Sequence, residues 1–316
     1  MLVFIVPLRS PKTANNWEKV SQLCNETLRS LLNQTSQNFQ ILLVCNEPPM
    51  NLEKSEKITV VADDFPIPSS PEEGYGDIMS KMKRGMLAAK ELKPDFVMKV
   101  DADDLVSRNV CAYTEKHIDS DGWFVGLGYV YEIGQSHLYL RPRFTTLSGS
   151  SHIFRTYDKD FPTSMNSISD EWLEPVAHHL GVNKLLKSRS RHLKILPFPS
   201  VIHRISSENM VATPLSTGRF SGTKAALWKM LCKRQLTNPI IDEFGFPKLS
   251  GHSPRHCYAN QLCENGYNIR QIQEVLAHKS EKTTLVYING RHPKSGSIKT
   301  VSEINQQYKI QKALMG

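Results

Sequence analysis

The sequence lacks long apolar runs and a cysteine framework. No stretch reaches the ~20 consecutive apolar residues of a membrane-spanning helix, so we expect any membrane contact to be peripheral. The apolar start, residues 2–6, lacks the basic flank and cleavage site of a signal peptide, which favours a buried strand. The six cysteines form no C-x-x-C pair and lie mostly in apolar segments. This pattern favours free thiols and a reducing, cytoplasmic setting.

Charge is distributed unevenly along the 316 residues, which carry a net charge of +8. Residues 1–150 hold 16 Lys and Arg against 19 Asp and Glu, which gives 16 − 19 = −3. The remainder holds 23 against 12, which gives +11. The basic half could meet phosphates, nucleic acid or an anionic membrane, and charge alone does not choose among them.

The first hundred residues alternate between continuous apolar runs and helical spacing. Apolar residues recur every three or four positions over 17–31 and 78–92, which predicts helices. Short, mostly apolar runs are typical of strands that are covered on both faces. They lie at 2–6, 41–45, 58–62 and 96–100. The alternation predicts an α/β fold with a parallel sheet flanked by helices.

The later sequence predicts an antiparallel addition and then helices. Residues 123–133 and 137–140 surround a Gly134-Gln-Ser turn, which favours a hairpin added to the same sheet. Helical character returns over 171–186 and, with basic residues, over 224–234, after a polar loop at 204–222. We place a domain boundary near 247–251, which gives domains 1–248 and 249–316.

Three carboxylates, Asp101, Asp103 and Asp104, follow the fourth predicted strand directly. Ligands of open α/β sheets bind at the carboxyl ends of parallel strands. Mg²⁺ typically binds one or two carboxylates together with substrate phosphates, so the cluster suits a metal–diphosphate site. An acidic cap on a strand is the alternative interpretation.

The order of these segments resembles the nucleotide-binding half of GT-A glycosyltransferases of the family 2 type. The likeness rests on the first strand with Arg9, segments 37–46 and 60–63, the Val-Asp-Ala-Asp-Asp motif and residues 149–154. It implies transfer of a sugar from a nucleotide-diphosphate donor to an unknown sugar or glycan acceptor, with Mn²⁺ or Mg²⁺ bound. In that interpretation Arg9, Asp63 and Asp101 contact the nucleotide sugar, with Asp63 and Asp64 at the position of the base or ribose. An acidic cap at the end of a strand is the alternative interpretation of Asp63 and Asp64.

A transferase that inverts configuration also needs a general base for the acceptor hydroxyl. Asp170 and Glu171 are the candidates. Glu174, His178 and His179 share the predicted helix, where a surface pair without a catalytic role is the favoured interpretation. His203, after the next apolar run, could add a contact to the metal or diphosphate.

The last quarter of the chain carries a second, unrelated pattern. His252 and Arg255 form an H-x-x-R motif, His278 follows 278 − 252 = 26 positions later, and Tyr287 another 287 − 278 = 9. These spacings resemble the final catalytic stretch of the tyrosine recombinase (phage integrase) family. The resemblance implies a tyrosine that attacks a DNA phosphodiester, surrounded by histidine and arginine donors, with no cofactor.

The recombinase pattern is incomplete. Arg219 lies only 255 − 219 = 36 residues before Arg255, too near to be the family's first arginine. The chain therefore resembles a metal-dependent glycosyltransferase fused to a mostly helical recombinase fragment, which could bind DNA weakly. The alternatives are a recombinase that acts in DNA recombination and integration through Tyr287, and an inactive fusion product.

Overall fold

The chain divides into two compact units, Met1–Pro247 and Lys248–Gly316. The structure is a computed structural model that describes residues 1–167, 176–177, 179–206, 222–246 and 267–276, with single positions at 208, 215, 262, 280, 281 and 284. None of the helices in this described part is long and apolar enough to cross a bilayer.

The first unit is a mixed α/β structure, as the sequence predicts. Its strands are β1 Leu2–Pro7, β2 Phe39–Cys45, β3 Ile58–Ala62, β4 Phe96–Lys99, β5 Leu105–Val106, β6 Gly122–Phe124, β7 Leu127–Glu132, β8 His137–Pro142, β9 His152–Arg155, β10 Lys194–Ile195, β11 Val201–Ile205 and β12 Lys233–Gln235. Its helices are α1 Trp17–Leu32, α2 Pro71–Leu92, α3 Val110–Lys116, α5 Val182–Ser188, α6 Thr223–Cys232 and α7 Asn238–Phe244, with short 3₁₀ turns at Pro11–Thr13, Phe144–Thr146 and Asp158–Asp160.

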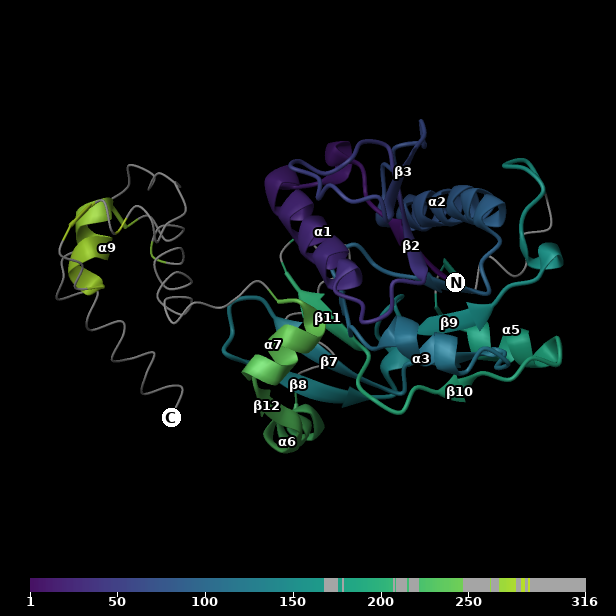
Figure 1. Cartoon of the computed structure of the whole chain (residues 1–316). Helices are drawn as coiled ribbons and strands as arrows, with labels where there is room; N and C mark the ends of the chain where they lie inside the picture. Colours follow the sequence, from purple (N-terminus) through teal and green to yellow (C-terminus); the bar gives the residue numbers. More distant parts are fainter. Residues whose placement is uncertain are drawn as a thin grey trace. The chain divides into compact units, whose positions relative to one another are not determined.

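A seven-stranded sheet in the order β10-β6-β9-β4-β1-β2-β3 forms the centre of this unit (Figure 1). Strands β4, β1, β2 and β3 are parallel to one another. Strand β9 runs antiparallel between β4 and β6. The four apolar runs predicted as strands are therefore confirmed, and their carboxyl ends share one edge of the sheet.

Helices cover both faces of this sheet, which explains why its central strands β1, β2 and β4 are largely apolar and buried. Alternate side chains of β1, such as Phe4, pack with Cys24 and Leu28 of α1 and with α3. Its other side chains, such as Ile5, pack with Met86 of α2 and with α5. The core thus lies in two layers, one on each side of the sheet.

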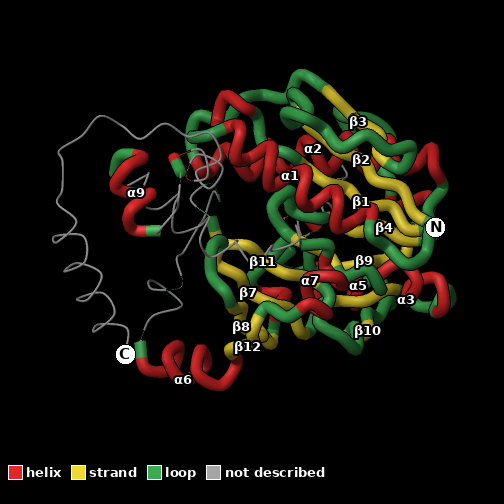
Figure 2. The backbone as a smooth tube through the Cα atoms, turned by 60° about the vertical axis from the view of Figure 1, so that its left-hand side comes forward, coloured by secondary structure: helices red, strands yellow, loops and turns green. Residues whose placement is uncertain are grey.

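A second, five-stranded sheet has the order β12-β8-β7-β11-β5. Strand β5 comes directly after the acidic loop, and β11 pairs with both β5 and β7. Phe244 and Phe246, at the end of α7, are buried in the cluster that covers this sheet. Figure 2 shows α7 and the strands of the two sheets from another side.

The predicted hairpin forms, but its place in the fold was predicted wrongly. Strands β7 and β8 pair antiparallel in the second sheet and not in the first. The single strand predicted over 123–133 is two strands, since β6 belongs to the first sheet and β7 to the second. Gly126 lies at the break, where a Cβ atom would meet Ile195 at 2.8 Å. The lack of a side chain at Gly126 therefore leaves room for the Ile195 side chain where the chain passes from one sheet to the other.

Two predicted helices differ in extent. The prediction of one continuous helix over 171–186 is wrong for the described residues. His179 and Gly181 have φ of 57° and 88°, and α5 begins only at Val182. Left-handed backbone cannot continue a right-handed helix. The helix expected over 224–234 is α6, and Arg234 lies in β12.

In the second unit the structure describes one helix, α9 Ile269–Val275. Asn268 caps it: the Asn268 side chain accepts from the Gln271 amide, and the Gln271 side chain accepts from the Asn268 amide. This reciprocal capping box fixes the start of the helix.

Candidate functional site

The acidic loop lies at the carboxyl edge of the first sheet. Strand β4 ends at Lys99, and Asp101, Asp103 and Asp104 occupy the turn that leads into β5. The neighbouring strands β1 and β3 end close before Arg9 and Asp63 at the same edge. The residues predicted to contact the nucleotide sugar and the metal, as far as the structure describes them, therefore lie at one edge of the sheet. This follows from the parallel direction of the strands that they follow.

Asp101 is held as an anion by its surroundings. Its Oδ1 lies 2.8 Å from the Lys99 ammonium, and its Oδ2 accepts the Gly149 amide at 2.9 Å. Burial raises the pKa of Asp101, but the charge and hydrogen bond of Lys99 outweigh burial and leave this pKa below its ordinary value. A Cβ atom at position 149 would lie 2.6 Å from the Asp101 carboxylate, so Gly149 permits this contact.

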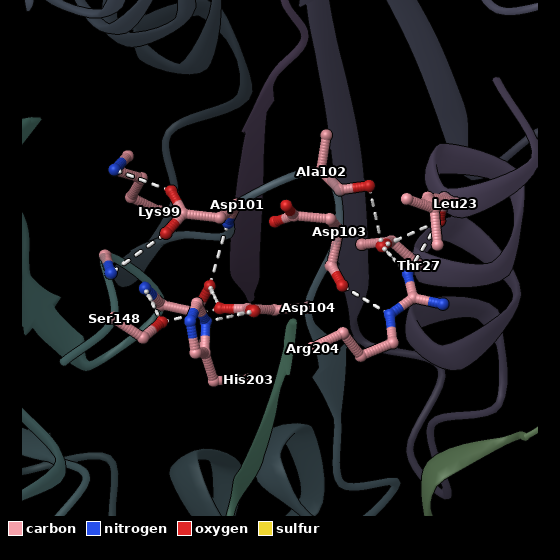
Figure 3. A network of polar contacts seen from close by, with 12 residues as sticks. Leu23, Thr27, Lys99, Asp101, Ala102, Asp103, Asp104, Ser148, His203 and Arg204 are labelled. Atoms are coloured by element: carbon pink, nitrogen blue, oxygen red, sulfur yellow. Dashed lines mark hydrogen bonds and ion pairs between the residues drawn. The ribbon is translucent and has the colours of Figure 1, made fainter. Parts of the chain in front are cut away.

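Asp104 is turned away from its two neighbours (Figure 3). It is fully buried, and its Oδ2 accepts from the hydroxyls of Ser148 and Ser150. Its Oδ1 lies 3.0 Å from Nδ1 of His203 on β11. Both oxygens of Asp104 thus connect the acidic loop to β11 and to the segment that precedes β9, while its expected role as a metal ligand stays a prediction.

His203 lies beside the buried carboxylate of Asp104, and this neighbour changes the pKa of His203. Burial lowers the pKa of His203, but the carboxylates around it, Asp104 first, outweigh burial and raise this pKa above its ordinary value. A protonated imidazole beside a buried carboxylate compensates the charge of that carboxylate. In this structure His203 therefore pairs with Asp104. The sequence suggested a contact to metal or diphosphate, which stays a prediction.

Asp103 has the most perturbed carboxyl group of the loop. Burial and then the charges of Asp104 and Asp101 raise the pKa of Asp103 to about 7. Its carboxylate points toward Asp101 in Figure 3. A cation bound close to a carboxyl group that is desolvated among like charges would stabilise the charged form of that group.

Arg204 fixes the backbone of the acidic loop to helix α1. Its guanidinium is buried, and its Nε donates to the main-chain carbonyl of Asp103. The remaining nitrogens donate to Glu26, to the Leu23 carbonyl at 2.8 Å and to the Thr27 hydroxyl at 3.1 Å. The Thr27 hydroxyl also lies 2.9 Å from the carbonyl of Ala102 (Figure 3). The loop is therefore rigidly held.

Arg9 and Asp63 lie at the expected edge but have protein partners. The Arg9 guanidinium donates to Thr13 and to the carbonyl of Glu208 at 2.9 Å. Asp63 is half-exposed, and its Oδ2 lies 3.0 Å from Nε of Arg84 on α2.

A buried polar group near this edge was missed by sequence reasoning. Lys81 of α2 is 1% exposed and lies 2.7 Å from Oδ2 of Asp77, with its ammonium 5.4 Å from the centre of the Phe65 ring. Burial lowers the pKa of Lys81 despite Asp77. Oδ1 of Asp77 and Oδ1 of Asn46, which follows β2, are buried and accept no hydrogen bond. The i,i+4 spacing of Asp77 and Lys81 was the available signal.

Several predicted residues lie outside the described part of the chain. They are the general-base candidates Asp170 and Glu171, their neighbours Glu174 and His178, and the recombinase-like His252, Arg255, His278 and Tyr287. Within the described residues, no group of three or more His, Cys, Asp or Glu side chains is arranged to hold a metal ion.

Comparison with known proteins finds two different likenesses. The sequence model of the phage integrase family matches residues 212–292. Tyrosine recombinase XerC of Rickettsia bellii is 53% identical over 45 residues, which are 14% of this chain and 15% of XerC. XerC of Rickettsia massiliae is 28% identical over 131 residues, 35% of this chain and 43% of XerC. The chain thus spans less than half the length of the curated relatives it matches.

The integrase resemblance predicted from residues 252–287 is confirmed by this match. The match begins 249 − 212 = 37 residues before the expected boundary and so includes α6, β12 and α7, which belong to the first unit. Among solved structures, S. aureus TarS 1-349 in complex with UDP-GlcNAc shows a likeness in fold, with a TM-score of 0.38 and 16% identity over 92% of this chain and 88% of that one. The bifunctional IspDF of Campylobacter jejuni gives a TM-score of 0.31 at 12% identity, over 66% of this chain and 50% of that one.

Proposed function

We propose that the first unit is a glycosyltransferase that uses a nucleotide-diphosphate sugar and a divalent cation. The observation that carries the proposal is the placement of Asp101 and Asp103 in the loop that follows β4, at the carboxyl edge of a parallel sheet. The pKa of Asp103, which burial and the charges of Asp104 and Asp101 raise to about 7, supports it. Perturbed groups in such positions are characteristic of functional sites. The rigid attachment of its backbone through Arg204 agrees with a precisely placed ligand.

The residues present fit Mn²⁺ or Mg²⁺ whose coordination shell is completed by the phosphates of a bound nucleotide. Asp103 would hold the ion, with Asp101 close by, and phosphate oxygens would supply further ligands. Two carboxylates are fewer than a closed protein site requires, which agrees with a cation that binds together with its substrate. When bound, the ion would neutralise charge on the departing diphosphate.

The protein's own side chains would position the nucleotide. The unpaired acceptors Oδ1 of Asn46 and Oδ1 of Asp77 are suited to N–H groups of a base, because a buried acceptor without a partner is costly until a ligand satisfies it. Arg9 and Asp63 would bind phosphate and ribose after releasing their present partners. Asp170 or Glu171 would accept the proton of the acceptor hydroxyl.

Cation-dependent hydrolysis of UDP-, GDP- and dTDP-sugars tests this proposal. We expect Asp103→Asn to lower Mn²⁺-dependent turnover by about 10²–10³-fold, the usual cost of removing one electrostatic contact from the transition state. Asp119→Asn, at an exposed aspartate after α3, is the matched control and should retain turnover. Turnover that survives in Asp103→Asn would exclude the proposed role of this carboxylate.

A second candidate function is DNA strand cleavage through Tyr287. The spacing of His252, Arg255, His278 and Tyr287 and the family match over 212–292 favour it. The lack of a correctly spaced first arginine speaks against autonomous activity. Incubation with nicked DNA, followed by denaturing electrophoresis, would reveal a covalent phosphotyrosine. Its presence in the wild type and absence in Tyr287→Phe would establish this activity.

A further inference from the structure

Helix α6 is apolar on both of its sides. On the inner side Ala225 is buried, and Trp228 donates from Nε1 to the Leu140 carbonyl at 3.0 Å. The Trp228 ring also packs against Tyr139 of β8, with ring centres 5.3 Å apart. The helix is thereby anchored to the second sheet, so its opposite side faces away from that sheet.

The outer side carries three large apolar residues at helical spacing. Leu227, Met230 and Leu231 are 53%, 70% and 62% exposed. Positions i, i+3 and i+4 share one face of a helix, so these side chains form a continuous patch. Among the described residues no other helix carries two exposed large apolar side chains. A surface helix normally presents polar residues to water, so this patch indicates a binding partner.

Positive charge borders the patch. Lys224 lies one turn before Leu227 on the same face, and the exposed Lys233 and Arg234 follow directly in β12. Residues 223–235 contain no Asp or Glu. A partner that offers both an apolar phase and negative charge would therefore be complementary to this surface.

We propose that this outer face of α6, together with Lys224, Lys233 and Arg234, docks on the surface of an anionic lipid bilayer. The three apolar side chains enter the boundary between headgroups and acyl chains, while the cations contact lipid phosphates. A second copy placed symmetrically would bring like charges together. Duplex DNA would satisfy the cations but leave the apolar side chains without a partner.

Co-sedimentation of the full chain with lipid vesicles tests this inference. We expect binding to vesicles rich in phosphatidylglycerol, little binding to phosphatidylcholine alone, and weakening by salt. An apolar variant and a charge variant should each lower the vesicle partition coefficient about tenfold or more. The apolar variant carries Leu227→Gln, Met230→Gln and Leu231→Gln, and the charge variant carries Lys224→Gln, Lys233→Gln and Arg234→Gln.

Matched changes elsewhere on the surface provide controls. They should leave binding unchanged, and thermal melts should show that all variants fold. The apolar control carries Met50→Gln, Leu180→Gln and Ile195→Gln, and the charge control carries Lys54→Gln, Lys90→Gln and Lys116→Gln.

Three results would overturn the inference. One is a wild type that does not sediment with anionic vesicles. Another is vesicle binding that the apolar variant retains in full. The third is a loss of self-association in the apolar variant, measured by light scattering, without any loss of vesicle binding, which would make a second copy the partner.

Discussion

At the residue scale, the contacts around the acidic loop divide its three carboxylates by role. Asp104 binds inward to Ser148, Ser150 and His203, and Asp101 pairs with Lys99. Asp103 has its pKa raised by burial and by both neighbours. Identical side chains thus have different electrostatic environments, and in the proposed function only Asp103 and Asp101 lie at the ligand.

Arg204 should be essential for the integrity of the loop. We expect Arg204→Met to destabilise the protein by about 3–5 kcal/mol, because it leaves Glu26 buried without its partner. Chemical denaturation measures the change. Arg108→Met, at an exposed arginine, should cost little. A loss no larger than that of the Arg108 variant would show that the Arg204 network contributes nothing to stability.

His152 predicts a dependence of stability on pH. Burial and then His179 lower the pKa of His152 to about 3. As pH falls from about 6.5 toward 3, the unfolded chain takes up a proton that the folded chain refuses, so the free energy of unfolding decreases. His152→Gln should remove part of this decrease, as measured by thermal melts across the pH range. An unchanged slope would show that another group is responsible.

At the element scale, helix α2 packs closely on the central sheet. A Cβ atom at Gly85 would lie 2.6 Å from Cγ2 of Ile5 and 3.1 Å from Cγ2 of Val44, whereas a Cβ at Gly76 has nothing within 4 Å. Both glycines lie in α2, where alanine is intrinsically the better helix former. Packing should therefore decide the sign of each substitution.

The two glycines give opposite predictions. Gly85→Ala should destabilise by about 1–3 kcal/mol through overpacking against β1 and β2. Gly76→Ala should stabilise by about 0.5–1 kcal/mol through helix propensity. Urea denaturation distinguishes them. Stabilisation by both substitutions would show that α2 is not closely packed on the sheet.

Much of the first sheet could be predicted from sequence because its central strands are buried on both faces. The apolar runs at 2–6 and 41–45 could be recognised without knowledge of the strands they pair with. The role of Asp104 could not be predicted, since its partners Ser148 and His203 lie 44 and 99 positions away. The split at Gly126 between two sheets depends likewise on contact with the distant Ile195.

At the scale of the whole molecule, the integrase match does not coincide with the boundary between units. Residues 223–246 fall within the match, yet β12 pairs with β8, and Phe244 and Phe246 complete the core over the second sheet. This segment is structurally part of the first unit, although its sequence matches the integrase family model.

Truncation tests this division. A chain that ends at Pro247 should remain soluble, melt cooperatively and keep any nucleotide-sugar hydrolysis. A chain that ends at Gly222 should aggregate, because removal of α7 exposes the apolar face that Phe244 and Phe246 cover. Equal solubility of both truncated chains would contradict the assignment of residues 223–246 to the first unit.

The most direct measurement is calorimetric titration of Mn²⁺ into the protein with and without UDP. The proposed site predicts binding that strengthens when UDP is present, is lost in Asp103→Asn and persists in the control Asp119→Asn, because phosphate oxygens and Asp103 complete the coordination together. Binding that is unaffected by Asp103→Asn, or the lack of any Mn²⁺ binding by the wild type with UDP present, would contradict it.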